Sequence, residues 1–111
     1  MAQESQIPLA RIQREDTRSY RVQGAMTFAT VTSLWHQGDG MISDENHLQI
    51  DLAGVTHTDS GGLALLVEWL REASRRGARI EFLNLPEQMR ALASAANLSE
   101  ILGLERETAP T

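Results

Sequence analysis

The sequence predicts a small α/β domain, in which helices pack chiefly on one face of a mixed β-sheet. Segments that alternate apolar and polar residues are followed by segments whose apolar residues recur every three or four positions. Helices placed between successive strands are typical of right-handed parallel crossovers. A chain of 111 residues is long enough to form one core. We therefore expect a single domain over residues 7–104, with a flexible N-terminus at 1–6 and a polar tail at 105–111.

Two short strands and a helix are predicted at the start of the domain. Residues 7–12 and 19–22 have strand-like alternation, and the polar cluster between them suits a turn. Residues 27–37 are predicted as an amphipathic helix, because four side chains share one face at spacing i, i+3, i+4 and i+7. These four are Phe28, Val31, Thr32 and Trp35. Such a stripe usually packs in the core, but tryptophan is also favoured at interfaces, so Trp35 is expected either in the core or partly exposed at a partner surface.

The segment 47–52 is the clearest strand of the sequence, and a polar loop over 53–62 is predicted at its carboxyl end. In sheets of this kind, the loops that leave the carboxyl ends of the strands are the favoured place for function. Residues 63–76 follow as the longest predicted helix, and Gly77 suits the position just after its C-terminus. The 53–62 loop and the start of this helix are therefore the first place to look for a site.

The C-terminal part of the domain is predicted to add one more strand and one more helix. Residues 79–85 alternate as a strand. Pro86 suits the first position of a helix that continues to about Ala96, and a further helical turn is expected within 97–104. The complete order is strand, strand, helix, strand, helix, strand, helix.

Composition excludes several classes of function. The formal net charge is −5 and the isoelectric point is about 5.1, which argues against nucleic acid as a partner. The chain has no cysteine, so disulfides, zinc–thiolate sites and thiol catalysis are absent. All ten basic residues are arginine, so the lysine of a phosphate-binding P-loop is missing. Neither a signal peptide nor a spanning segment is recognisable, and we expect a cytoplasmic protein without direct membrane insertion.

The inventory of catalytic side chains is thin. His36, His47 and His57 are isolated in sequence and lack the spacing of metal ligands, so no metal site is expected. Asp51 and Asp59 could converge near the end of a strand, but no base or nucleophile is arranged with them. We expect no enzymatic activity and no cofactor.

The most informative motif is Asp59-Ser60-Gly61-Gly62, which stands between a strand and the longest helix. Ser60 is predicted to be the N-cap of that helix, and the charge of Asp59 favours the positive helix end. In a purely structural interpretation the hydroxyl only caps the helix, and Gly61 and Gly62 only permit a tight entry into it. In a functional interpretation, Ser60 and two glycines without side chains let another protein approach the backbone, or let a kinase reach the hydroxyl.

Leu65 and Trp69 form an apolar pair on the predicted helix. At 100° per residue they cluster with each other but lie away from the main apolar stripe. This placement suits either contact with a partner protein or a second packing contact inside the domain.

The motif and its surroundings resemble the STAS domain family, named for sulfate transporters and anti-sigma factor antagonists. The resemblance covers residues 7–102 and is carried by Ile50-Asp51-Leu52, Asp59-Ser60-Gly61-Gly62-Leu63, Gly77 and Pro86. It implies a mixed α/β fold and a protein-binding surface at the Asp-Ser motif and the following helix. Members of this family generally act as adaptors and switches, and most lack enzymatic activity.

Two branches of the family compete. Anti-sigma factor antagonists typically carry Asp-Ser-Ser/Thr-Gly-Leu-Gly, with a serine that a kinase phosphorylates, and this chain departs from the pattern at Gly61 and Ala64. Subunits of phospholipid-transporting ABC systems carry Asp-Thr-Gly-Gly-Leu-Ala-Leu-Leu, which differs from residues 59–66 only by serine in place of threonine. The spacing from Gly24 to Leu34-Trp35 also matches this branch, where the tryptophan meets the ATPase subunit.

The second branch implies a non-catalytic adaptor that supports the ATPase subunit of a phospholipid transporter maintaining outer-membrane lipid asymmetry. Contact with the permease and the periplasmic lipid-binding subunits would be indirect, and the chain would be cytoplasmic and peripheral to the inner membrane through its partner. The alternative is an anti-sigma factor antagonist switched by phosphorylation of Ser60. The expected partner-binding residues are Thr58, Asp59, Ser60, Gly61, Gly62, Trp35, Leu65 and Trp69.

Overall fold

The structure, a computed structural model, describes residues 9–103. The expected N-terminal segment 1–6 and tail 105–111 lie outside the described residues. The elements follow in the predicted order of two strands, a helix, and then alternating strands and helices. They are β1 (Ala10–Arg14), β2 (Ser19–Met26), α1 (Val31–Gln37), β3 (His47–Thr58), α2 (Ser60–Arg75), β4 (Arg79–Leu83) and α3 (Glu87–Ala95).

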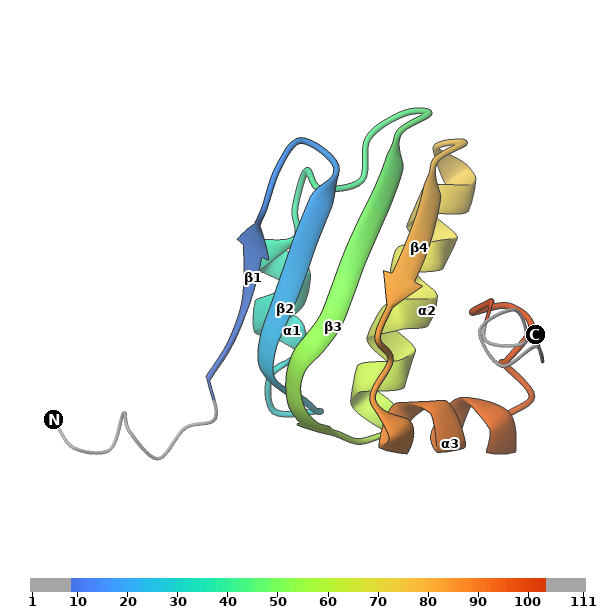
Figure 1. The fold of residues 1–111 in the computed structure, drawn as a ribbon. Coiled ribbons are helices and arrows are strands. Elements are labelled where there is room, and N and C mark those ends of the chain that lie inside the picture. The colour runs from blue at the N-terminus through green and yellow to red at the C-terminus, as the bar shows by residue number, and fades with distance from the viewer. Residues whose placement is uncertain (1–8, 104–111) are drawn as a thin grey trace, which may run out of the picture.

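The strands form a mixed sheet in the order β1-β2-β3-β4 (Figure 1). β1 pairs antiparallel with β2, whereas β2, β3 and β4 are parallel. Each parallel neighbour is reached through a helix, α1 between β2 and β3 and α2 between β3 and β4. The carboxyl ends of the three parallel strands therefore lie at one edge, where α1, α2 and α3 are entered.

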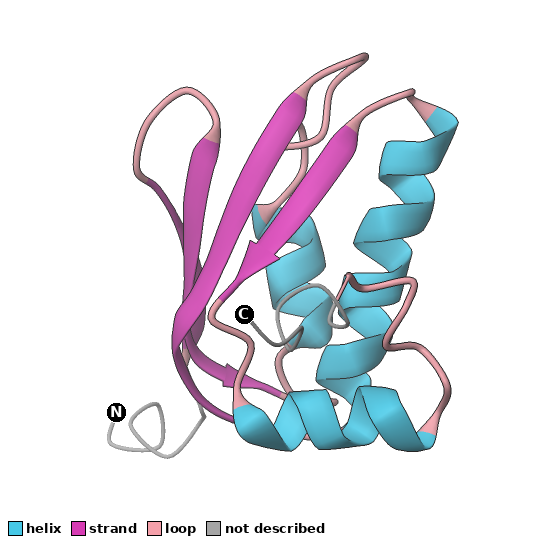
Figure 2. Cartoon of the chain, turned by 45° about the vertical axis from the view of Figure 1, so that its right-hand side comes forward, coloured by secondary structure: helices cyan, strands magenta, loops and turns pink. Residues whose placement is uncertain are grey.

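The helices α1 and α2 cover one face of the sheet, and α3 runs across its end (Figure 2). The core lies between this face and the helices, and its fully buried side chains include Val22, Leu34, Leu48, Ile50, Leu52, Leu66, Trp69 and Met89. The opposite face carries polar pairs, such as Gln49 with Glu81 and Asp51 with Asn84. The predicted fold class is confirmed. Within residues 9–103, no helix is long and apolar enough to cross a membrane.

β3 extends much further than predicted. It runs for 12 residues to Thr58, so most of the segment expected to be a polar loop is a strand. Gly54 suggested a loop, but it stands opposite Gln23 at an irregularity in the β2–β3 ladder, where its absent side chain leaves room for β2. Glycine at a bulge is compatible with a strand, and the β-branched residues that follow favour one.

α1 begins at Val31, four residues later than predicted, because residues 27–30 form a turn. The Thr30 hydroxyl donates to the carbonyl of Ala25 (2.7 Å) and accepts from the backbone N–H of Thr27 (3.0 Å). Threonine side chains that bond to nearby backbone groups compete with helix formation. The predicted apolar stripe is also wrong as a core face, since Leu34 is the buried residue of α1.

The ends of several other elements differ from the prediction by a few residues. β1 begins at Ala10, and residues 7 and 8 of the predicted first strand lie outside the described residues. α3 begins at Glu87, with Pro86 as its N-cap in an extended conformation. Within residues 97–103 the backbone N–H of Leu102 donates to the carbonyl of Leu98 at 3.0 Å, so the single helical turn predicted there is present without a further helix. Such shifts are normal for element ends, which fray and depend on capping.

A pH-dependent contribution to stability comes from Asp51 on the open face of the sheet. A hydrogen bond from the Asn84 side chain, and a second from the backbone N–H of Ala53, lower the pKa of the Asp51 carboxyl below its ordinary value. Because the pKa is lower in the folded chain, the carboxylate stabilises the fold above pH ~4. This contribution is lost as the pH falls through the folded-state pKa.

We predict that Asn84→Gly flattens the decline of the unfolding free energy between about pH 5 and pH 2, because Asp51 then titrates nearer its ordinary pKa. Glycine accepts the positive φ of 58° at this position. Asn97→Gly is the matched control, since Asn97 has a φ of 60°. Urea unfolding at a series of pH values measures both variants. If the unfolding free energy of Asn84→Gly declined with falling pH as steeply as that of the parent chain, the prediction would be contradicted.

Candidate functional site: a groove beside the Asp-Ser-Gly-Gly motif

The Asp-Ser-Gly-Gly motif brings the start of α2 against the turn between β2 and α1. A Cβ atom on Gly62 would lie 2.2 Å from the Thr58 hydroxyl oxygen and 2.4 Å from the carbonyl oxygen of Met26. A Cβ atom on Gly61 would lie 2.8 Å from the backbone nitrogen of Phe28. Only glycine permits this approach, so the two glycines allow a tight entry into α2, as the structural interpretation of the motif predicts, and both are buried.

Asp59 joins the two segments through hydrogen bonds. Its backbone is extended and its Oδ1 accepts from the N–H of Gly61 at 2.8 Å, so Asp59 is the N-cap of α2. Its Oδ2 accepts from the backbone N–H of Phe28 at 3.4 Å, a weaker contact. The prediction that Ser60 caps the helix is wrong by one residue, because the aspartate oxygen already fills that role. Ser60 is the first helical residue and is exposed.

Thr58, one of the predicted partner-binding residues, is buried, as are Gly61, Gly62, Leu65 and Trp69. It is 1% exposed, and its hydroxyl donates to the carbonyl of Met26 at 2.7 Å. Its backbone N–H reaches the Gln88 side chain of α3 at 3.3 Å. Thr58 therefore ties β2, β3 and α3 together beneath the motif and does not form its surface.

An apolar groove of about 260 Å³ opens between α1 and α2, and its lining reaches Gly61, the residue after Ser60. We call it the α1–α2 groove. Its walls include Phe28 and Trp35, which are 69% and 40% exposed. The lining residues are Phe28, Val31, Thr32, Trp35, Gly61, Ala64, Leu65 and Glu68. Large exposed aromatic side chains gathered at one place are typical of protein-binding surfaces.

The apolar pair Leu65 and Trp69 is not available as a surface. Leu65 is 4% exposed and Trp69 only 1%, because both lie on the side of α2 that faces α1. Of the two interpretations, the second packing contact is the one the structure shows. Leu65 still forms part of the groove floor, whereas Trp69 belongs to the core and borders a smaller hollow of about 100 Å³ beside Trp35.

The sequence leaves both tryptophans open between the core and a partner surface, and in the structure Trp69 is buried whereas Trp35 is exposed. The structure also adds Phe28 to the site: it belongs to a stripe that usually packs in the core, yet it lines the groove together with Trp35. Phe28 precedes α1 and is held outward by the turn, so helical periodicity does not apply to it. Its neighbours Thr27 and Thr30, which can bond the backbone, were the available signal for a turn.

The remaining candidates for chemistry do not converge. Asp51 lies in the middle of β3 and Asp59 beyond its end, about 25 Å apart along the strand at the usual rise per residue. His36, His47 and His57 are exposed, His36 on α1 and the other two at opposite ends of β3. Within residues 9–103, no three histidine, aspartate or glutamate side chains are grouped so that they could hold a metal ion.

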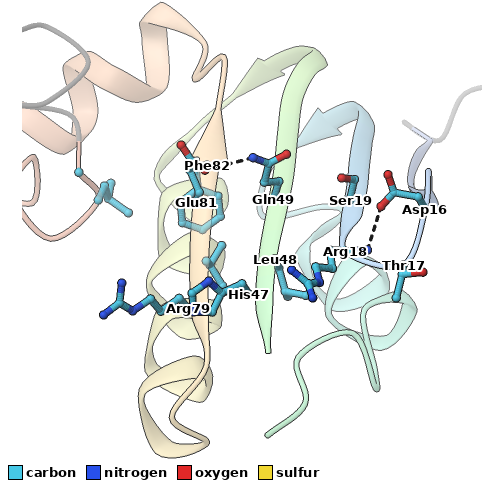
Figure 3. Close-up of a pocket in the computed structure, with 13 residues that line it drawn as sticks. Asp16, Thr17, Arg18, Ser19, His47, Leu48, Gln49, Arg79, Glu81 and Phe82 are labelled. Atoms are coloured by element: carbon cyan, nitrogen blue, oxygen red, sulfur yellow. Dashed lines mark hydrogen bonds between the residues drawn. The ribbon is translucent and has the colours of Figure 1, made fainter. Parts of the chain in front are cut away.

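A larger, shallow hollow of about 810 Å³ lies near the starts of the parallel strands, at the other end of the sheet (Figure 3). Its acidic side chains already have partners: Glu81 accepts from Gln49 at 3.2 Å, and Asp16 accepts from the backbone N–H of Arg18 at 2.9 Å. Backbone hydrogen bonding at Arg18 lowers the pKa of Asp16. The arginines here are interspersed with carboxylates, so the hollow does not favour a ligand of one charge.

Comparison with known proteins agrees with the fold and the motif. A family model described as "Mlab, STAS domain" matches residues 11–104. The chain belongs to the STAS domain family. A similar protein is the intermembrane phospholipid transport system binding protein MlaB of Haemophilus influenzae, which is 27% identical over 81 residues. That alignment covers 69% of this chain and 77% of the relative.

A solved structure shows the same STAS fold. The anti-sigma factor antagonist SpoIIAA in its unphosphorylated form matches with a TM-score of 0.62 and 13% sequence identity. The match covers 93% of this chain and 99% of SpoIIAA. At this identity the likeness establishes the architecture of the sheet and helices, and it confirms the expectation that the family resemblance gave.

We predict that Gly62→Ala lowers the unfolding free energy by about 1–3 kcal/mol, because the added methyl overlaps the Thr58 hydroxyl and the Met26 carbonyl. Gly38→Ala is the control, since its Cβ would meet first the end of the Ile12 side chain, at 3.3 Å. Urea denaturation followed by circular dichroism measures both. Equal losses in the two variants would show that the close approach at Gly62 is not tight.

We predict that the two tryptophans differ sharply in their effect on stability. Trp69→Ala is expected to lower the unfolding free energy by about 3–5 kcal/mol, since a fully buried side chain is removed. Trp35→Ala is expected to cost less than about 1 kcal/mol, because substitutions of exposed residues usually have small effects. The same denaturation measurement compares them, and similar losses would place Trp35 in the core.

Proposed function

We propose that this STAS protein is a non-catalytic adaptor subunit that binds the ATPase subunit of a phospholipid-transporting ABC system and supports its activity. The system would maintain the lipid asymmetry of the outer membrane. Family membership and the similarity to MlaB, which is named for intermembrane phospholipid transport, support this choice. The observation that carries it is the α1–α2 groove, where Phe28 and Trp35 are exposed and whose lining reaches Gly61, the residue after exposed Ser60.

The arrangement suits a rigid docking surface. Asp59, Gly61 and Gly62 fix the start of α2 against the β2–α1 turn, and Thr58 anchors the segment from below. Ser60, Phe28 and Trp35 are then the groups that a partner would meet, while Leu65 supports the groove from beneath. Aromatic anchors on a preorganised scaffold contribute most of the affinity in many interfaces.

The adaptor would act by steadying its partner. The chain has no lysine and therefore no P-loop lysine of its own, so its part in ATP-driven transport would be carried out through the ATPase. Contact with the permease and the periplasmic lipid-binding subunits would be indirect. The chain would be cytoplasmic and held at the inner membrane by the ATPase.

An anti-sigma factor antagonist switched by phosphorylation of Ser60 is the second candidate. The SpoIIAA fold and the exposure of Ser60 at a helix N-terminus favour it. A phosphate there would be favoured by the positive end of the α2 helix dipole. Stoichiometric phosphate on Ser60 in the protein purified from its native cells, detected by mass spectrometry, would support this candidate over the transporter adaptor.

We predict that Ser60→Glu weakens binding to the ATPase subunit at least tenfold while the fold remains intact, because a new charge would be desolvated at the interface. Co-purification and isothermal titration with the ATPase subunit measure the affinity, and circular dichroism checks the fold.

Ser43→Glu is the matched control, because Ser43 is exposed in the loop before β3, close to the other end of α2. It should bind like the parent chain. Undiminished binding by Ser60→Glu would remove the Asp-Ser motif from the interface, and a parent chain that does not bind the ATPase at all would refute the proposed function.

A further inference from the structure

The size of the α1–α2 groove limits what can occupy it. Its volume of about 260 Å³ lies below the usual range of roughly 300–1,000 Å³ for small-molecule pockets. The walls are the side chains of two helices and the turn before α1, and Phe28 and Trp35 stand exposed at its rim. A groove of this kind suits a few apolar side chains that project from a protein partner.

The secondary structure of the walls indicates the form of that partner segment. The main-chain groups of α1 and α2 are hydrogen-bonded within the helices, so the groove offers no strand edge to which an extended peptide could pair. A helix satisfies its own main-chain hydrogen bonds and can lay an apolar stripe between two other helices. The groove therefore favours an amphipathic helix.

The charge of the groove indicates what flanks the apolar stripe. Glu68 carries the only formal charge among the residues that line it. Its ion pair with Arg71 is long, at 3.8 Å, and both side chains are more than half exposed, so this pair contributes little and a cation of the partner can compete for Glu68. On the other side of Trp35, Asp39 adds a further carboxylate, whereas the charge of Glu72 is already paired with Arg75 and with Arg76, the latter at 2.7 Å.

We propose that the α1–α2 groove binds an amphipathic helix of the ATPase subunit whose apolar side chains are flanked by lysine or arginine. The inference rests on the proposed function and specifies the chemistry of its interface. Phe28 and Trp35 hold the apolar side chains, and Glu68 receives the basic group. The overall charge of −5 assists the encounter with a basic segment.

Photo-crosslinking can identify the occupant directly, because the chain has no cysteine and one introduced at a chosen position is unique. Thr32→Cys places a benzophenone maleimide label at the exposed rim of the groove, and Ser43→Cys places the same label away from it. Each labelled chain is irradiated in its complex with the ATPase subunit, and crosslinked peptides are sequenced by mass spectrometry. From Thr32 we expect a peptide with apolar residues at helical spacing and a lysine or arginine within one turn, and from Ser43 we expect no such peptide.

Substitutions test the two halves of the proposal separately. Phe28→Ser should weaken binding of the ATPase subunit at least tenfold, whereas Ile101→Ser, which removes an apolar side chain that is 61% exposed elsewhere, should not. Glu68→Arg should weaken binding about tenfold and reduce its salt dependence, whereas Glu81→Arg on the open sheet face should leave affinity unchanged.

The outcomes separate this inference from the proposed function. If the ATPase binds and Ser60→Glu abolishes binding, but Phe28→Ser and Glu68→Arg do not weaken it, the adaptor role stands and the groove inference is overturned. A crosslink from Thr32 to a lipid, to a second copy of this chain or to an acidic segment also overturns it. If the parent chain does not bind the ATPase, the proposed function itself fails.

Discussion

The contact between the start of α2 and the turn after β2 determines how the rest of the molecule is arranged. Two glycines allow the backbones to meet, Asp59 holds them by hydrogen bonds to both segments, and Thr58 fixes the end of β3 to Met26. This contact places α1 beside α2 on one face of the sheet. It also turns Phe28 outward, so the same constraint that closes the fold creates the apolar surface.

Much of the architecture could be predicted because it depends on local patterns of strong periodicity. The long helix α2, the strand β4 and the order of all seven elements were predictable from apolar spacing, Gly77 and Pro86. The predicted strand ends before β3 does, because Gly54 resembles a loop residue. In the structure Gly54 lies at an irregularity in the ladder between β2 and β3, where the pairing accommodates it. The length of β3 therefore depends on its pairing with β2, and the pattern within one segment contains no information about the neighbouring strand.

The candidate site was predictable in its motif and less so in its surface. Asp59, Ser60 and the glycines were recognisable from their place between a strand and a helix. Whether Asp59 or Ser60 is the N-cap depends on one hydrogen bond, from the N–H of Gly61 to the side chain of Asp59. The two tryptophans could not be assigned by periodicity, because both faces of α2 are covered, one by the sheet and the other by α1. The exposure of Trp35 and the burial of Trp69 depend on the position of α1, which periodicity does not give.

The groove floor connects binding with folding. Leu65 lies both under the groove and in the core, so an occupant that packs on it would favour the folded chain by mass action. A chain without an occupant leaves Phe28 and Trp35 open to water and to other apolar surfaces. In a cell, copies made in excess over their partner would then be the copies most prone to aggregation and proteolysis, which would tie the abundance of this protein to the supply of its partner.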